Sequence, residues 1–313
     1  MSPRPPRRTV FAVFPGCEIL DLAGPMQAFH EAAMFDAGYD VEYRAPTPTV
    51  RSAQGLELTG LGPLPEVGAG DRVIVPGFPL AMGRVPPKLV SWLREAYRAG
   101  AEVCSVCTGA FALGEAGLLD GRACTTHWRR VAELEARFPR AQVVGDRLFV
   151  IADRIITSAG IAAGIDMALA LIERDAGPVV AGEVAREMVV YMRRDGAHHQ
   201  GSVYLDYQTH LSPGIHQVQQ YLVTNPATRE TLGELADRAG MSERNLTRVF
   251  RRATGISIHD YRERLRLERA RDLMRNPTLT LDAVAAACGF ADGRQLRRIW
   301  SVRYDQPPSA SRA

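Results

Sequence analysis

Two sets of residues in this chain have types and spacings that suit chemistry. The first centres on Cys107, where a β-branched run at Glu102–Val106 meets a helical pattern at residues 109–119 with small residues in its first turn. A cysteine at such a strand-to-helix turn is arranged like a nucleophile elbow, and the nearby helix N-terminus favours the thiolate. The pattern predicts a reactive or ligand-binding cysteine, and a plain buried thiol is the alternative interpretation.

The second set is a group of arginines near the C-terminus. Thr231-Leu-Gly-Glu234 has the form of a capping box that opens one helix, and Ser242 is placed to cap the next. In that next helix Arg244, Thr247 and Arg248 share one face by their i, i+3 and i+4 spacing. Because arginine can bond guanine O6 and N7 with two hydrogen bonds, the pattern predicts a helix-turn-helix that contacts double-stranded DNA. The alternative for each arginine is a solvated helix face.

A comparable unit follows about 49 residues later, at residues 281–300. Asp292 is the expected cap of its second helix, and Arg294, Arg297 and Arg298 face outward in the predicted helix. Between the units, a helical pattern from Ser257 to Asn276 has about 19 residues and a length of roughly 28 Å. A spacer of that length suits two recognition helices about one DNA turn, roughly 34 Å, apart.

Composition and charge agree with this division of labour. Residues 226–313 contain 17 Arg against 11 Asp plus Glu, a net charge of +6, while residues 1–225 have a net charge of −3. The basic end suggests a polyanionic partner. Five scattered cysteines favour a reducing compartment, without a disulfide framework or a metal site. No apolar run reaches the roughly 18 residues that a membrane span needs, so we expect a cytoplasmic protein.

The elements that must position these residues fall into two domains, as expected for 313 residues. Short β-branched runs alternate with helical patterns over residues 9–195, which predicts a parallel, doubly wound α/β sheet. A polar stretch at residues 196–214 contains Gly and Pro and is the expected linker. Residues 215–313 form the predicted all-α domain with the two helix-turn-helix units.

The C-terminal residues resemble the AraC/XylS family of transcription regulators. The segments that carry the resemblance are Ala236-Asp-Arg-Ala-Gly-Met-Ser, Phe250-Arg-Arg-Ala-Thr-Gly255, Arg264-Leu-Arg-Leu-Glu-Arg-Ala270 and Ala287-Cys-Gly-Phe290. The resemblance implies base contacts by Arg244, Thr247, Arg248, Arg294 and Arg298, and RNA polymerase as a further partner. The chain departs from the family pattern at its end, and Gly293 enters the second recognition helix early, at a cost of up to about 1 kcal/mol.

The N-terminal residues resemble the amidotransferase-like superfamily that includes the bacterial PfpI-type intracellular proteases, with its flavodoxin-like fold. The resemblance rests on the elbow at Cys107 and on the segments Pro15-Gly-Cys-Glu-Ile-Leu-Asp-Leu-Ala-Gly-Pro25, Thr125-Thr-His127-Trp and Thr157-Ser-Ala-Gly-Ile-Ala-Ala-Gly-Ile-Asp166. It implies that Cys107, His127 and Asp21 occupy the positions of nucleophile, base and supporting carboxylate. Glu18 is a rival for the acid. Together with the AraC-type end, the chain is similar to the GlxA-like regulators.

Two hypotheses for the N-terminal domain compete: a sensor with a pocket for a small-molecule effector, and an active cysteine-dependent hydrolase or lyase. The superfamily commonly has Pro-Gly-Gly where this chain has Pro76, Gly77 and Phe78, and the bulky Phe78 conflicts with an oxyanion hole there. We therefore expect a sensor without turnover or cofactor. We also expect a homodimer, since regulators gain affinity by linking sites.

Overall fold

The computed structural model divides the chain into two compact units, Met1–Gln200 and Gly201–Ala313, and each is described by itself. The structure describes residues 6–35, 37–82, 85–190, 194–196, 200, 207, 210–274, 276–304 and 307–308. Much of the predicted linker at 196–214 lies outside this set, so its bounds stay a prediction. Where the chain is described again, Tyr207 packs against the hydrophobic core of the second unit, and the first helix there begins at Pro213.

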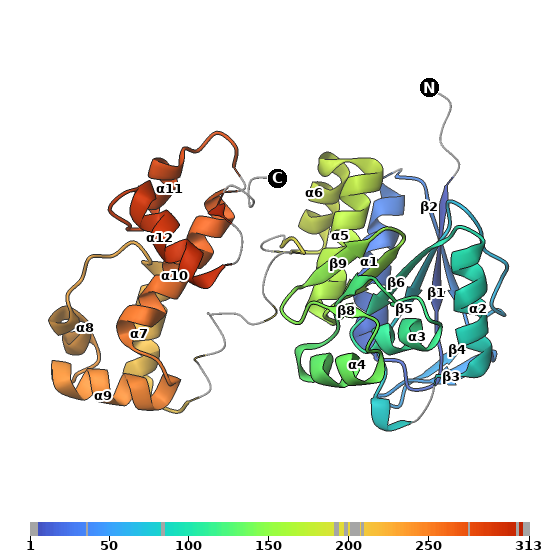
Figure 1. The fold of residues 1–313 in the computed structure, drawn as a ribbon, viewed down its shortest axis with the longest axis horizontal. Coiled ribbons are helices and arrows are strands. Elements are labelled where there is room, and N and C mark those ends of the chain that lie inside the picture. Colours follow the sequence, from blue (N-terminus) through green and yellow to red (C-terminus); the bar gives the residue numbers. More distant parts are fainter. Residues whose placement is uncertain are drawn as a thin grey trace. The chain divides into compact units, whose positions relative to one another are not determined.

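A six-stranded sheet forms the centre of the first unit (Figure 1). Its strands in spatial order are β2 (Tyr39–Arg44), β1 (Arg7–Ala12), β5 (Arg72–Val75), β6 (Glu102–Val106), β10 (Ile155–Ser158) and β9 (Phe149–Ala152). The first five strands pair in parallel, as the alternating pattern predicts. The edge strand β9 pairs antiparallel with β10, so the sheet is mixed.

Both faces of this sheet are buried, because its strands send alternate side chains into two separate cores. In β5, Ile74 belongs to one core, while Val73 and Val75 belong to the other. The first core is covered by α1 (Ile19–Met34), α5 (Ala162–Ala176) and α6 (Pro178–Glu187); the second is covered by α2 (Pro87–Arg98), α3 (Gly109–Glu115) and α4 (Val131–Arg137). The predicted doubly wound α/β class is therefore confirmed.

Three smaller features complete the first unit. A hairpin of β3 (Thr49–Arg51) and β4 (Glu57–Thr59) was not expected from the sequence, since its strands have three residues each. The strands β7 (Ala123–Cys124) and β8 (Gln142–Val143) pair in parallel beside the main sheet. Two 3-10 turns, η1 (Leu80–Met82) and η2 (Trp128–Arg130), flank the carboxyl ends of the strands.

The regular secondary structure in the described residues of the second unit is all helical (Figure 1). Its helices are α7 (Pro213–Thr224), α8 (Leu232–Arg238), α9 (Glu243–Thr254), α10 (Ile258–Met274), α11 (Leu281–Ala287) and α12 (Gly293–Arg303). It has two hydrophobic cores, and α10 belongs to both: Leu265 packs with α7, α8 and α9, while Leu267 packs with α11 and α12. Helix α10 has 17 residues, hence a length of about 25 Å. It connects the two helix-turn-helix units, as predicted.

Among the helices of the described ranges, none is both long and apolar enough to cross a membrane. Within the same ranges, His, Cys, Asp and Glu form no group of three or more that would suit a metal ion.

Candidate nucleic-acid interface and the cavity at Cys107

The first helix-turn-helix consists of α8 and α9, and both predicted caps are present. Thr231 and Glu234 form a reciprocal capping box at the start of α8, and the side chain of Ser242 accepts the N–H of Asn245 at the start of α9. Leu246 and Phe250 are fully buried and fix the orientation of α9. As a result, the face of α9 that carries the predicted base-contacting residues is exposed.

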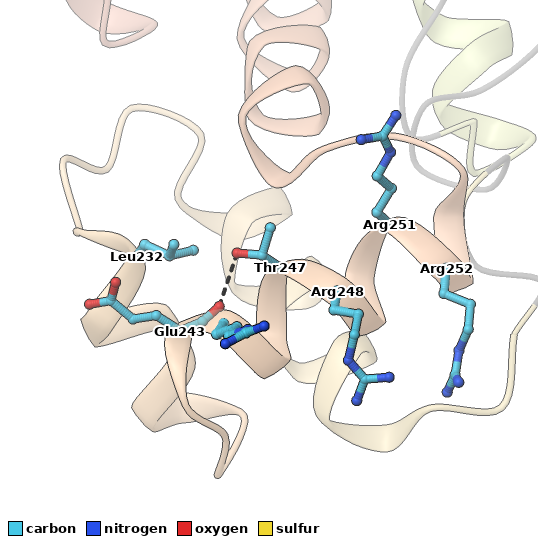
Figure 2. A pocket seen from close by; sticks show the side chains of 7 residues that line it. Leu232, Glu243, Thr247, Arg248, Arg251 and Arg252 are labelled. Carbon is cyan, nitrogen blue, oxygen red and sulfur yellow. Dashed lines mark hydrogen bonds between the residues drawn. The ribbon is translucent and has the colours of Figure 1, made fainter.

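The structure brings those residues together in one hollow of about 780 Å³ that lies along α9 (Figure 2). Arg244, Thr247 and Arg248 line it, as do Arg251 and Arg252, which were not among the predicted site residues. The sequence could have indicated Arg252, since it follows Arg248 by the same four-residue step that separates Arg248 from Arg244. In Figure 2, Arg248 and Arg252 extend in the same direction and Arg251 points away from them.

Two hydrogen bonds organise this face before any DNA is present. The guanidinium of Arg248 donates to Oδ1 of Asn245 at 2.8 Å, one helical turn earlier. The hydroxyl of Thr247 donates to the carbonyl of Glu243 at 2.9 Å (Figure 2). The donor of Thr247 is thus used within the helix, and its methyl group is available for an apolar contact such as a thymine methyl.

The second helix-turn-helix consists of α11 and α12. The side chain of Asp292 accepts the N–H of Gln295 at 2.7 Å, which confirms the predicted cap. Arg294, Arg297 and Arg298 are all exposed on the free face of α12. The base contacts of individual arginines stay a prediction.

The expectation that Gly293 weakens α12 omits a contact that only the fold shows. The N–H of Gly293 donates to Oδ1 of Asp282 at 2.8 Å, and a Cβ at this position would lie 2.9 Å from that oxygen and 3.1 Å from Leu281. A larger residue at this position would crowd the side chains of Asp282 and Leu281 at the start of α11, so these side chains would have to shift.

In the first unit, a cavity of about 620 Å³ lies at the carboxyl ends of the strands. Its lining includes Asp21, Cys107 and His127, which are far apart in the sequence. Gly77 lies directly behind them, since a Cβ on it would be 2.3 Å from Oδ2 of Asp21 and 2.9 Å from Cβ of Cys107. The structure thus brings together all four residues that the resemblance singles out.

Cys107 occupies a strained turn between β6 and α3. Its φ of 56° is a left-handed conformation that residues with a side chain rarely adopt. The N–H of Cys107 donates to the carbonyl of Ser158 at 2.9 Å. A Cβ on Gly160 would be 2.5 Å from the Cβ of Cys107. Only glycine is small enough beside this turn, which holds the thiol at the cavity.

The environment of Cys107 favours the neutral thiol. Burial, followed by the charge of the Asp21 carboxyl, raises the pKa of Cys107 to about 12. The expectation of a thiolate is therefore wrong, because burial and a neighbouring acid outweigh the N-terminus of the seven-residue helix α3. Burial also raises the pKa of Asp21, although the N–H of Ile161, which donates to its Oδ1 at 2.7 Å, acts in the opposite direction.

Asp21, and not Glu18, is the acid beside the cysteine. Asp21 is 1% exposed, and its Oδ2 has no conventional hydrogen-bond partner; the weakly donating thiol of Cys107 lies next to it. Glu18 lies before α1, is only partly buried, and accepts a hydrogen bond from the amide of Gln54. The buried carboxyl of Asp21 thus lies against the thiol of Cys107 and the backbone of Gly77 at the cavity.

The backbone donor expected for an oxyanion hole is already used. The N–H of Phe78 donates to Oγ1 of Thr108 at 2.7 Å, and the same hydroxyl donates to the carbonyl of Phe78 at 2.6 Å. The ring of Phe78 packs edge-on against the ring of Phe14, with 5.2 Å between the ring centroids. Thr108 was not among the predicted site residues, although its position next to Cys107 was a usable signal. A developing oxyanion would have to displace this reciprocal pair.

His127 lines the cavity but is not arranged as a base for Cys107. Its Nδ1 accepts the N–H of Arg129 at 3.3 Å, and burial together with Arg129 and Arg130 lowers its pKa. Among the residues that the structure describes, no hydrogen bond joins His127 to Cys107. Arg129 and Arg130 also line the cavity and add positive charge to it.

Comparison with protein families gives two matches on this chain. The model of the DJ-1/PfpI family matches residues 7–174, and a helix-turn-helix domain model matches residues 235–313. These ranges contain, respectively, the cavity at Cys107 and both recognition helices.

Three known proteins show what the combination is similar to. The HTH-type transcriptional regulator CdhR of Pseudomonas aeruginosa is 32% identical over 312 residues, which are 97% of this chain and 90% of CdhR. The isonitrile hydratase of Pseudomonas putida is 32% identical over 174 residues, which are 53% of this chain and 71% of that enzyme. The crystal structure of an AraC family transcriptional regulator from Pseudomonas putida has a TM-score of 0.51 at 23% identity and covers 58% of this chain and 100% of its own; it supports the fold alone.

Proposed function

The chain belongs to the AraC family of DNA-binding transcription regulators, with an N-terminal domain of the DJ-1/PfpI family, and we propose that a small molecule held in the cavity at Cys107 controls its binding to DNA. The observation that carries this proposal is the state of Asp21. Its buried side chain lines, beside the thiol of Cys107, a cavity of about 620 Å³, which is large enough for a small ligand.

The lining indicates the chemistry of the effector. The thiol of Cys107 is only a weak hydrogen-bond donor to Asp21, so a ligand that donates an N–H or O–H to this carboxyl would make a stronger hydrogen bond. Arg129 and Arg130 favour a ligand that also carries an acceptor or an anionic group. Leu20, Phe78 and Ile161 supply apolar surface for the rest.

A ligand-shift thermal screen of the full-length protein tests this role. Small polar molecules with both donor and acceptor groups are added, and a true effector raises the melting temperature of wild type. Asp21→Asn keeps the shape but replaces the carboxylate, so the shift should shrink strongly; Glu18→Gln, at the rim, should retain most of it. A ligand whose stabilisation is equal in wild type and Asp21→Asn would contradict the proposed site.

The second candidate is a cysteine-dependent hydrolase or lyase, which the similarity to isonitrile hydratase keeps in view. The raised pKa of Cys107, the occupied N–H of Phe78 and the missing bond to His127 all oppose it. Wild type and Cys107→Ala should be assayed for amidase, isonitrile hydratase and glyoxalase-type activity. Turnover in wild type that disappears in Cys107→Ala would favour the enzyme; no turnover, together with unchanged DNA binding by Cys107→Ala, supports the sensor.

We further propose that the regulator acts in the cytoplasm, together with RNA polymerase, as a homodimer. Residues 1–200 form the expected dimer interface, since two linked recognition domains bind paired sites more tightly than one. Sedimentation of full-length protein and of residues 1–200 measures this. We expect dimers of both, and a monomer of residues 1–200 at high concentration would place dimerisation elsewhere or rule it out.

A further inference from the structure

A path of hydrogen bonds leads from Cys107 to the point where the chain leaves the first unit. The hydroxyl of Thr126 donates to the carbonyl of Cys107 at 2.8 Å. The carbonyl of the same Thr126 accepts a hydrogen bond from the side-chain amide of Gln200 at 2.9 Å. Gln200 is the last residue of the first unit, and the chain enters the second unit at Gly201.

Gln200 is anchored by more than one contact. Its amide nitrogen also lies 3.1 Å from the carbonyl of Gly145 and 3.3 Å from Oγ1 of Thr125, and its backbone N–H donates to Oδ1 of Asp146 at 2.9 Å. The anchor has one defect, since Oε1 of Gln200 is buried without a partner. A buried acceptor without a partner raises the free energy of the anchored state, so a small rearrangement can release it.

The segment that holds Gln200 directly precedes a residue of the cavity wall. Thr125 and Thr126 are fully buried, and the N–H of Thr125 donates to Oγ1 of Thr157 on β10 at 2.8 Å. His127 follows at once and lines the cavity. A ligand that shifts His127 or the Cys107 turn therefore acts on the same peptide groups that hold Gln200, because close-packed groups do not move independently.

We propose that Gln200 is the positioning residue through which occupancy of the Cys107 cavity reaches the segment leading to the DNA-binding unit. Occupancy changes the balance between an anchored and a released Gln200, and with it the hold on the chain where it leaves the first unit. The proposal rests on the effector role proposed above, and it assigns the transmission of cavity occupancy to the side-chain amide of Gln200.

The test uses a covalent stand-in for the effector. Iodoacetamide alkylates Cys107 and leaves a carboxamide in the cavity beside Asp21; the other four cysteines are buried, and mass spectrometry verifies a single adduct at Cys107. The affinity of full-length protein is then measured for a duplex that unmodified wild type selects from a random pool. We expect the adduct to change Kd about fivefold or more in wild type, the lower end of typical coupling between sites.

In Gln200→Leu the anchor is absent with or without the adduct, so the adduct should leave Kd unchanged, and the unmodified variant should bind the duplex as the wild-type adduct does. Thr126→Val keeps the volume but removes the bond to Cys107, and it should have the same effect if Gln200→Leu proves unstable. The matched control is Gln142→Leu, which removes another glutamine amide of the same unit, bonded only to the carbonyl of Gly121 in the described contacts, and it should respond like wild type.

A full response of both Gln200→Leu and Thr126→Val to the adduct would overturn the proposal, because occupancy would then reach DNA by another route. A Kd that the adduct changes in no protein would overturn it as well. The effector role itself is judged separately by the thermal screen with Asp21→Asn, which does not involve DNA.

Discussion

The bond between Asn245 and Arg248 makes a quantitative prediction about DNA recognition. Arg248 is exposed, yet its guanidinium is already held 2.8 Å from Oδ1 of Asn245. Fixing a free arginine on binding costs about 0.5–1.5 kcal/mol, and Asn245 removes part of that cost in advance. We expect Asn245→Ala to weaken binding to the selected duplex by about 0.5–1 kcal/mol, which is about two- to fivefold in Kd. Arg248→Ala should cost about 1–3 kcal/mol.

The assay is fluorescence anisotropy of full-length protein with the selected duplex and with an unrelated duplex of equal length, at several salt concentrations. Asn245→Ala should spare the unrelated duplex, since attraction to phosphates does not need a fixed guanidinium. Arg252→Ala is the matched control: it removes an exposed charge from the same hollow and should weaken both duplexes alike, with a salt slope smaller by about 1.

The double variant separates the two explanations for any loss. If Asn245 acts through Arg248, its substitution costs nothing further in the Arg248→Ala background. An additive double variant would refute the reasoning, because Asn245 would then contact DNA by itself. Equal losses of Arg248→Ala on both duplexes would show that Arg248 contacts phosphate and not a base.

Two other predictions follow from the fold and the cavity. Residues 201–313 should bind DNA by themselves, with an affinity that falls steeply as salt rises, whereas residues 214–313 lack Tyr207 from the core and should melt at a lower temperature by circular dichroism. Alkylation of Cys107 should accelerate about tenfold per pH unit from about pH 7 to about pH 10, because a pKa of about 12 keeps the thiol protonated there, and a plateau near pH 8.5 would contradict this. Asp21→Asn removes a charge that raises this pKa, so alkylation at neutral pH should become faster.

The helix-turn-helix units could be predicted from the sequence because their signals are local. The capping residues Thr231, Ser242 and Asp292 lie within three residues of the groups they bond, and the arginine faces follow from the helical repeat. The sheet was predictable for a similar reason, since most of its strands are short runs rich in β-branched and other apolar residues. The antiparallel pairing of β9 and the hairpin of β3 and β4 depend on contacts between segments, so the pattern of each segment alone did not reveal them.

The cavity shows the boundary between the two kinds of information. The sequence alone determined that Cys107 sits at a strand-to-helix turn, and resemblance added Asp21 and His127 to the same site. Only the tertiary structure decided their chemical state: burial keeps the thiol protonated, and Thr108 occupies the N–H of Phe78, 30 residues away in the chain. The anchor of Gln200 on Thr126 spans 74 residues. Solvent exclusion and hydrogen bonds between distant segments arise only when the chain is folded, so no local pattern records them.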